Sequence, residues 1–261
     1  MKGGICIRQC LCNKYFSLGF FRIVHLLSVL YVKILINMAI KKIIAFGSAK
    51  GGVGKSSITA SLALTLSKDK KIGILDADVY GPNQNILFNL DTKNEITSQG
   101  INPALHNDIK IVSMGNILNY EDAAVWRGPM LSGAIKKLIN DTQWGELDYL
   151  FIDMPPGTGD AYLTIFKELV VDKFILITTP NKLAISDLQK TITMLKKLDV
   201  KILGYICNNI FNVEDVDNNF FVTNNIKHLG TYEFDTNLHD FNLDYNSSIT
   251  EEISKVILSD V

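Results

Sequence analysis

The fold of this 261-residue chain is decided by the stretch AKGGVGKS, residues 49–56. An apolar run at 43–46 precedes this stretch, and a helix-like run at 58–66 follows it. A strand, a glycine-rich turn and a helix in this order form a phosphate-binding loop, because glycines let backbone N–H groups approach phosphate oxygens closely. The pattern predicts that Lys55 contacts the β- and γ-phosphates and that the Ser56 hydroxyl binds Mg²⁺.

The loop carries one more lysine than a phosphate-binding loop requires. The ordinary pattern G-x-x-x-x-G-K-[ST] expects glycine where this chain has Ala49, whereas x-K-G-G-x-x-K-[ST] is matched in full by residues 49–56. This second pattern resembles that of the dimeric ATPases of the MinD, ParA and nitrogenase-iron-protein group. The resemblance implies that the extra lysine, Lys50, reaches the nucleotide of a partner subunit. There it would stabilise charge on the transferring phosphoryl group, as an arginine finger does.

Strand-like and helix-like runs alternate after this loop. The expected strands are 43–48, 72–76, 109–113, 149–153, 173–179 and 201–207, and the expected helices are 55–67, 129–140, 160–169, 185–198 and 248–258. Apolar strands between helices indicate a parallel sheet covered on both faces. We therefore predict a doubly wound, mostly parallel α/β fold of the P-loop NTPase type, formed by a single domain at residues 38–261. The Asn/Asp-rich stretch 208–225 is the clearest long loop that we expect.

Residues 1–37 differ from this domain in composition. They contain five Lys and Arg residues and no Asp or Glu, and their apolar run at 23–32 is shorter than the ~20 residues that span a bilayer. Two interpretations stay open, namely a signal or mitochondrial presequence and a mis-assigned start of translation ahead of Met38. Export is disfavoured, because a secreted ATPase would lack its nucleotide. We expect a cytoplasmic location, or the mitochondrial matrix if the leader is a presequence.

Composition and charge exclude some classes of partner. Hydrophobic residues make up 47% and charged residues 20% of the chain, as in an ordinary globular protein with a sizeable core. The net charge is −1, and the domain after the leader has 21 basic against 27 acidic residues, so no basic surplus points to nucleic acid. The last expected helix, 248–258, is short and net acidic, unlike a basic membrane-binding helix. We expect neither nucleic acid nor a membrane as partner.

Acidic residues follow two of the expected strands, at the edge where an open parallel sheet binds its ligands. Asp76 and Asp78 follow 72–75, and Asp153 follows 149–152. Asp153 is predicted to bind Mg²⁺ directly or through water, and Asp76 to orient or activate the attacking water. A turn-forming role stays open for Asp78. The predicted catalytic residues are Lys50, Lys55 and Asp76, and the predicted Mg²⁺ site consists of Ser56, Asp76 and Asp153.

The segment MPPGTGD, residues 154–160, directly follows Asp153. Two prolines stiffen its first half and two glycines free its second half. We predict that it senses the γ-phosphate and changes position on hydrolysis.

Several longer segments give a more specific resemblance. The segments LDADVYGP (75–82), WRGPM (126–130), WGELDY (144–149) and IDMPPGTGD (152–160) are similar to the Mrp (ApbC-like) family of ATP-binding iron–sulfur cluster carriers. The resemblance covers roughly residues 43–229. It implies a homodimer with ATP at the subunit interface, slow hydrolysis, and one bridging 4Fe–4S cluster that is transferred to apo iron–sulfur proteins. It also implies that Asn208 recognises adenine, since an amide both donates and accepts hydrogen bonds. The predicted nucleotide-binding residues are Ala49, Lys50, Gly51, Gly52, Val53, Gly54, Lys55, Ser56, Ser57 and Asn208.

The chain departs from the family at the cluster ligands. Family carriers place C-x-x-C shortly after the asparagine, so that two subunits supply four thiolates. No cysteine follows Cys207 in this chain, and Cys207 precedes Asn208 within an expected strand, where a buried thiol is ordinary. Cys6, Cys10 and Cys12 in the leader lack the spacing of known cluster motifs. The cluster ligands are therefore unassigned, with Cys207 as a candidate, and the presence of a 4Fe–4S cluster stays open.

Three functions are compatible with these features. We favour an ATP-binding and ATP-hydrolysing carrier or assembly factor of the Mrp type with a degenerate cluster site. The alternative is a ParA- or MinD-like ATP-driven dimerisation switch in positioning or partition, which the acidic domain and the acidic last helix disfavour. The third is a nucleotide-binding regulator without turnover, which the intact phosphate loop disfavours.

Overall fold

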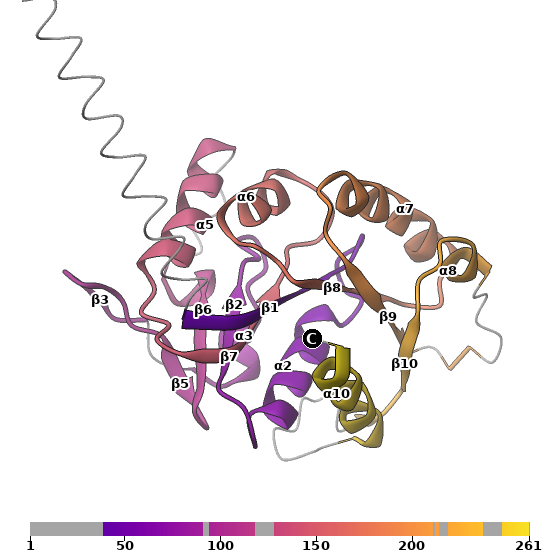
Figure 1. The fold of residues 1–261 in the computed structure, drawn as a ribbon, viewed down its shortest axis with the longest axis horizontal. Helices are drawn as coiled ribbons and strands as arrows, with labels where there is room; N and C mark the ends of the chain where they lie inside the picture. The colour runs from indigo at the N-terminus through magenta and orange to yellow at the C-terminus, as the bar shows by residue number, and fades with distance from the viewer. Residues whose placement is uncertain are drawn as a thin grey trace, which may run out of the picture.

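The computed structural model describes residues 39–90, 94–117, 128–210, 212–213, 219–236 and 247–260. One large sheet forms the centre of this structure, with the strand order β10-β9-β8-β1-β7-β2-β6-β5 (Figure 1). Its strands are β1 (Ile40–Gly47), β2 (Ile72–Asp76), β5 (Ala104–His106), β6 (Ile109–Ser113), β7 (Leu147–Asp153), β8 (Lys173–Thr178), β9 (Ile202–Asn209) and β10 (His228–Glu233). All neighbouring pairs are parallel except β5 and β6. The predicted mostly parallel sheet is confirmed.

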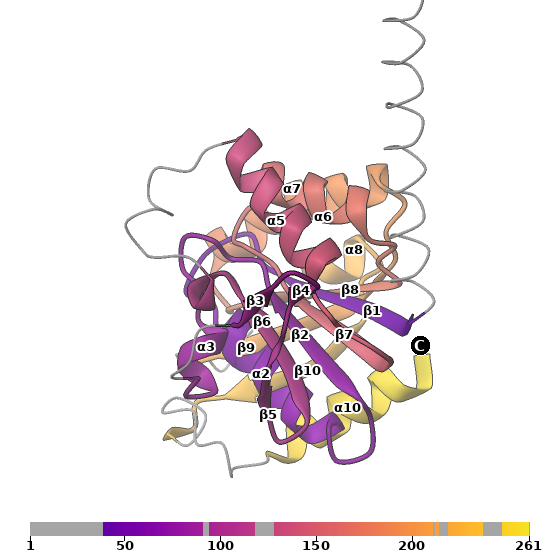
Figure 2. The same cartoon turned by 90° about the vertical axis from the view of Figure 1, so that its left-hand side faces the viewer.

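Helices cover both faces of the sheet. Figures 1 and 2 show α5 (Pro129–Asp141), α6 (Asp160–Glu168) and α7 (Lys182–Lys197) on one face, and α2 (Lys55–Leu66) and α10 (Ser248–Asp260) on the other. The shorter elements are α3 (Gln84–Leu87), α8 (Asn219–Thr223), the 3₁₀ turn η1 (Met114–Asn116) and a small hairpin of β3 (Ile96–Thr97) and β4 (Gly100–Ile101). This is the doubly wound α/β fold that the sequence predicts.

The central strand β1 shows why the sheet needs helices on both sides. Its residues 43–46 are all buried, and they alternate between the two apolar cores of the molecule. Ile43 and Ala45 belong to the core under α5, α6 and α7, whereas Ile44 and Phe46 belong to the core under α2 and α10. Burial of each large apolar side chain contributes about 1.5–3 kcal/mol, so both faces of this strand stabilise the fold.

The prediction of a long loop at 208–225 is partly wrong. The strand β9 continues to Asn209, because Asn208 and Asn209 pair with Tyr232 and Glu233 of β10. The five-residue helix α8 occupies another part of this stretch. The strand β10 was not predicted, since Gly230 and Thr231 interrupt its apolar residues and it lies at the edge of the sheet.

Some predictions fall outside the described residues. They concern the leader 1–37 with Cys6, Cys10 and Cys12, and Trp126 and Arg127 of the WRGPM segment. Across the described ranges, no helix combines the length and the apolar character needed to cross a bilayer.

The sheet register brings the predicted site together. Phe46 of β1 and Asp76 of β2 both pair with Asp153 of β7, so the carboxyl ends of three neighbouring strands meet at one edge. The phosphate loop leaves β1 at this edge, as expected for an open parallel sheet.

Candidate functional site

The loop between β1 and α2 depends on glycine for its shape. Gly52 and Gly54 have φ angles of 76° and 82°, in the left-handed region that residues with a Cβ rarely adopt. A Cβ added to Gly54 would lie 2.2 Å from Nδ2 of Asn208. Glycine at position 54 is therefore required both by the backbone conformation and by the close approach of β9.

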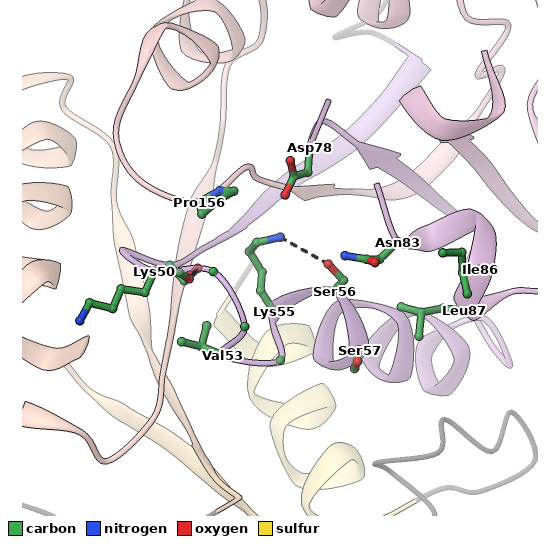
Figure 3. A pocket seen from close by; sticks show the side chains of 14 residues that line it. Lys50, Val53, Lys55, Ser56, Ser57, Asp78, Asn83, Ile86, Leu87 and Pro156 are labelled. Carbon is green, nitrogen blue, oxygen red and sulfur yellow. Dashed lines mark hydrogen bonds between the residues drawn. The ribbon is translucent and has the colours of Figure 1, made fainter. Parts of the chain in front are cut away.

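The loop forms one wall of a solvent-open cavity of about 340 Å³ (Figure 3). We call this space the phosphate cavity. It is lined by Ser48, Lys50, Gly51, Gly52, Val53, Gly54, Lys55, Ser56, Ser57, Asp78, Asn83, Ile86, Leu87 and Pro156. A glycine-rich turn that leads into a helix N-terminus, with a lysine beside it, is suited to bind phosphate groups.

A second cavity of about 280 Å³, the base cavity, adjoins the first. The two cavities share Gly52, Gly54 and Ser57. The base cavity is completed by Ile58, Ser61, Asn208, Ile210, Tyr232, Glu233, Phe234 and Asp235. The Asn208 amide donates to the Val53 carbonyl over 3.1 Å, which fixes the side chain at the junction. A cavity with apolar walls and a few polar groups is suited to a planar base.

Lys55 is buried at the floor of the phosphate cavity, with 7% of its side chain exposed. Its ammonium group forms an ion pair with Oδ1 of Asp153 and lies 3.4 Å from the Ser56 hydroxyl. Burial alone would lower the pKa of Lys55, but the surrounding carboxylates, Asp153 first and then Asp76 and Asp78, together raise the pKa. The lysine is therefore charged and available to phosphate, and it neutralises Asp153 in this arrangement.

Asp153 is held from its other side by a residue that no sequence pattern predicts. Gln84 of α3 donates through Nε2 to Oδ2 of Asp153 over 2.8 Å, and both side chains are fully buried. Its Oε1 atom is buried and has no hydrogen-bond partner within the described part of the chain. No sequence motif identifies Gln84 as a site residue. Its side chain comes close to Asp153 only in the folded sheet, where β2 pairs with β7.

The residues at this point fit Mg²⁺. A carboxylate and a hydroxyl are the oxygen ligands that this ion prefers, and Mg²⁺ usually retains several waters. The unpartnered Oε1 of Gln84 is an acceptor that a metal-bound water could satisfy. Asp153 and Ser56 are the residues that would hold the ion. Asp76, the third residue of the predicted Mg²⁺ site, has its carboxylate occupied by hydrogen bonds from protein donors.

Asp76 lies behind the phosphate cavity and does not line it. Burial, followed by repulsion from the Asp153 carboxylate, raises the pKa of Asp76 to about 7. Its carboxylate accepts hydrogen bonds from Asp78 N (3.1 Å), Asn83 N (3.0 Å), Gln84 N (3.1 Å) and Ser113 Oγ (2.9 Å). Four donors make it an anchor for the backbone that leads into α3.

Asp78, in contrast, lines the phosphate cavity (Figure 3). Its Oδ1 accepts hydrogen bonds from the backbone N–H groups of Tyr80 (3.2 Å) and Gly81 (3.1 Å). Burial raises the pKa of Asp78, although the Lys55 charge opposes this effect. Asp76 rather than Asp78 is the residue predicted from the sequence to orient the attacking water, yet Asp78 is the one of the two that lines the phosphate cavity. The turn-forming role left open for Asp78 is also present.

Lys50 extends away from Lys55 in Figure 3. Its ammonium group lies 3.4 Å from Oδ2 of Asp187 on α7, and both side chains are 40% exposed. Such an orientation leaves Lys55 as the lysine directed at the phosphates of its own loop. The orientation is compatible with a role of Lys50 outside its own subunit.

The segment 154–160 contacts both the strand and the loop. The Gly157 N–H donates to the Ser48 carbonyl over 3.2 Å, and Met154 N–H donates to the Phe46 carbonyl over 3.0 Å. Pro156 lines the phosphate cavity. The segment can thus contact a bound γ-phosphate, and its movement on hydrolysis stays a prediction.

Cys207 is the single cysteine within the described ranges, and it is 1% exposed. Burial, and then the negative charge of Glu233, raises its pKa to about 11. Among the described residues, no three His, Cys, Asp or Glu side chains cluster as metal ligands would. The structure therefore offers no surface thiolate for a cluster at this position.

A family model described as ParA, NUBPL iron-transfer P-loop NTPase, matches residues 39–255. An iron–sulfur cluster carrier protein of Pseudomonas fragi is 41% identical over 186 residues, which are 67% of this chain and 65% of that protein. An iron–sulfur cluster transfer protein of Dictyostelium discoideum is 41% identical over 173 residues, 65% of this chain and 54% of the relative. The chain thus spans less than two thirds of the length of these relatives.

Solved structures agree with the fold. A nucleotide-binding protein from Archaeoglobus fulgidus in complex with ADP is 30% identical and superimposes with a TM-score of 0.71, covering 84% of this chain and 94% of that one. The septum site-determining protein MinD from Pyrococcus horikoshii, complexed with Mg-ADP, is 22% identical with a TM-score of 0.67, covering 84% and 96%. The second likeness shows the fold alone.

Proposed function

Because this chain belongs to the ParA-type family of NUBPL iron-transfer P-loop NTPases, we propose that it binds and hydrolyses ATP in the assembly of iron–sulfur proteins. The observation that carries the proposal is the phosphate cavity, in which the glycine loop, Lys55 and Asp78 surround one space. The relatives named as iron–sulfur cluster carrier and transfer proteins support the process in which this ATPase acts.

The proposed mechanism assigns a separate task to each residue. Lys55 leaves Asp153 and binds the β- and γ-phosphates, because phosphate oxygens compete for its charge. Ser56 and Asp153 would hold Mg²⁺, which would neutralise charge on the phosphates. The base occupies the base cavity against Asn208, and Asp78 orients the attacking water. Asp76 keeps the backbone around Asp78 in place through its four hydrogen bonds.

The proposed active form is a homodimer with ATP at the subunit interface. Lys50 would contact the nucleotide of the partner, since it points away from Lys55. The hydrolysis is proposed to be slow and Mg²⁺-dependent. Its clients are apo iron–sulfur proteins, and the cluster is cargo for which the described residues present no surface cysteine.

The iron–sulfur role is tested by the maturation of an apo-ferredoxin from iron and sulfide under anaerobic conditions. We expect the full-length protein with ATP to accelerate cluster insertion, measured by visible absorbance, compared with the same protein and ADP. Cys207→Ser is expected to accelerate it equally, because the Cys207 thiol is buried and its pKa is raised. Equal rates with ATP and ADP would argue against the role, and a loss in Cys207→Ser would identify that thiol as a ligand.

The two aspartates are expected to behave differently when each is changed to asparagine. Asp78→Asn should lower kcat for ATP hydrolysis by about 10²–10⁴-fold with ADP affinity retained, as for a residue that positions the reacting water. Asp76→Asn should instead lower the free energy of unfolding by about 1–3 kcal/mol, because an amide cannot accept from all four donors. Turnover and urea unfolding measure these effects. A wild-type kcat in Asp78→Asn would return the catalytic role to Asp76.

A further inference from the structure

Gln84 is the buried residue that joins the elements around the metal-binding carboxylate. Its Nε2 donates to Oδ2 of Asp153 over 2.8 Å and to the Ser56 carbonyl over 3.1 Å. Its backbone N–H donates to Oδ2 of Asp76 over 3.1 Å. One side chain therefore connects β7 with the first turn of α2, while its backbone is tied to β2.

The two oxygens of Asp153 have different partners. Oδ1 is paired with the Lys55 ammonium, and Oδ2 is held by the Gln84 amide. When phosphate groups attract Lys55, Oδ1 loses its partner while Oδ2 keeps one. A neutral amide holds the carboxylate without cancelling its charge, so the full negative charge remains for a cation.

The second atom of the Gln84 amide points to the same conclusion. Oε1 is fully buried and has no hydrogen-bond partner among the described residues. Buried acceptors without a donor are rare, because the loss of hydration is not compensated. A water molecule bound to a cation has two hydrogens to donate and would satisfy this acceptor.

We propose that Gln84 is a positioning residue of the Mg²⁺ site: its amide nitrogen orients Asp153, and its amide oxygen accepts from a water bound to the ion. The inference rests on the proposed nucleotide function. It extends the site to a residue on α3, the helix that directly follows Asn83 of the phosphate cavity. Gln84 thereby affects metal binding without touching the nucleotide.

The test is the variant Gln84→Met, which keeps the length of the side chain and removes its amide. The full-length protein is mixed with a fluorescent methylanthraniloyl-ADP, first in excess chelator and then with increasing Mg²⁺. We expect the Mg²⁺ concentration at half-saturation to rise about 10–100-fold, the usual effect of removing a residue that orients a metal ligand. The affinity for the nucleotide in chelator should stay within about twofold of the wild type, because Gln84 does not line the phosphate cavity.

Gln143→Met is the matched control. It removes an amide hydrogen bond of the same kind, from Nε2 to the Gln99 carbonyl over 2.6 Å, at an exposed position far along the chain. This variant should have the Mg²⁺ dependence of the wild type. If circular dichroism shows that Gln84→Met does not fold, the variant Gln84→Asn replaces it. Its side chain is one methylene shorter, so the amide no longer reaches Asp153. We expect the same rise in the Mg²⁺ concentration at half-saturation.

The possible results separate the inference from the proposed function. An unchanged Mg²⁺ dependence in the Gln84 variant would overturn the inference. An equal loss of nucleotide affinity with and without Mg²⁺ would also overturn it, because that pattern indicates only structural damage. A wild-type protein that binds no ADP would overturn the proposed function, and the inference with it.

Discussion

Replacement of Lys55 by methionine is expected to lower kcat for ATP hydrolysis by at least about 10²-fold, as loss of a preorganised charge at a reacting centre does. The same change should lower the free energy of unfolding by about 3–5 kcal/mol, because the fully buried Asp153 loses its only cation among the described residues. Turnover measured by phosphate release and urea unfolding followed by circular dichroism report the two effects separately.

A double variant distinguishes the two roles of Lys55. Lys55→Met combined with Asp153→Asn removes both charges of the buried pair, so most of the lost stability should return. The activity should not return, since neither the phosphate ligand nor the metal ligand is restored. If the double variant were as unstable as Lys55→Met alone, the buried ion pair would not explain the stability. Residual turnover at the wild-type rate in Lys55→Met would show that a contaminant hydrolyses the ATP.

Replacement of Lys50 by alanine is expected to lower kcat by about 10³-fold, in the range of a charge supplied from a partner subunit. The affinity for ADP and the free energy of unfolding should hardly change. The ion pair with Asp187 is 40% exposed on both sides, and a pair of this kind contributes at most about 1 kcal/mol. Single-turnover kinetics, nucleotide titration and urea unfolding measure these three quantities.

Mixing two inactive variants tests whether Lys50 acts on the neighbouring subunit. In a mixed dimer, a Lys55→Met subunit still supplies Lys50 to the nucleotide that a Lys50→Ala subunit binds. An equal mixture should recover about one quarter of the wild-type rate, since half of the dimers are mixed and each has one complete site. Asp187→Ala serves as the control and should retain activity, because it removes only the ion-pair partner of Lys50. No recovery in the mixture would place Lys50 in its own subunit's site.

Local patterns predicted much of the fold and part of the site. The phosphate loop could be predicted because its glycines, lysine and hydroxyl are consecutive in the chain. Asp153 could be predicted because it ends an apolar strand. Which of Asp76 and Asp78 lines the phosphate cavity could not be predicted, since that depends on which carboxylate the start of α3 covers.

The features that the sequence did not predict share one property. Gln84 acquires its role only through the pairing of β2 with β7, and the Lys50–Asp187 ion pair requires α7 to lie beside the loop. The strand β10 lacks a continuous apolar run and is recognised only by its register with β9. All of these depend on contacts between distant segments, which periodicity and motif spacing do not encode.

The contact between Gly54 and Asn208 restricts which substitutions the protein can accept at these two positions. The positive φ of Gly54 excludes larger residues there, and its missing Cβ leaves the space that the Asn208 amide occupies. Mutations that enlarge position 208 must therefore displace β9 rather than the loop. Under the proposed function, the loop geometry that binds the phosphates thus also limits which bases fit the base cavity.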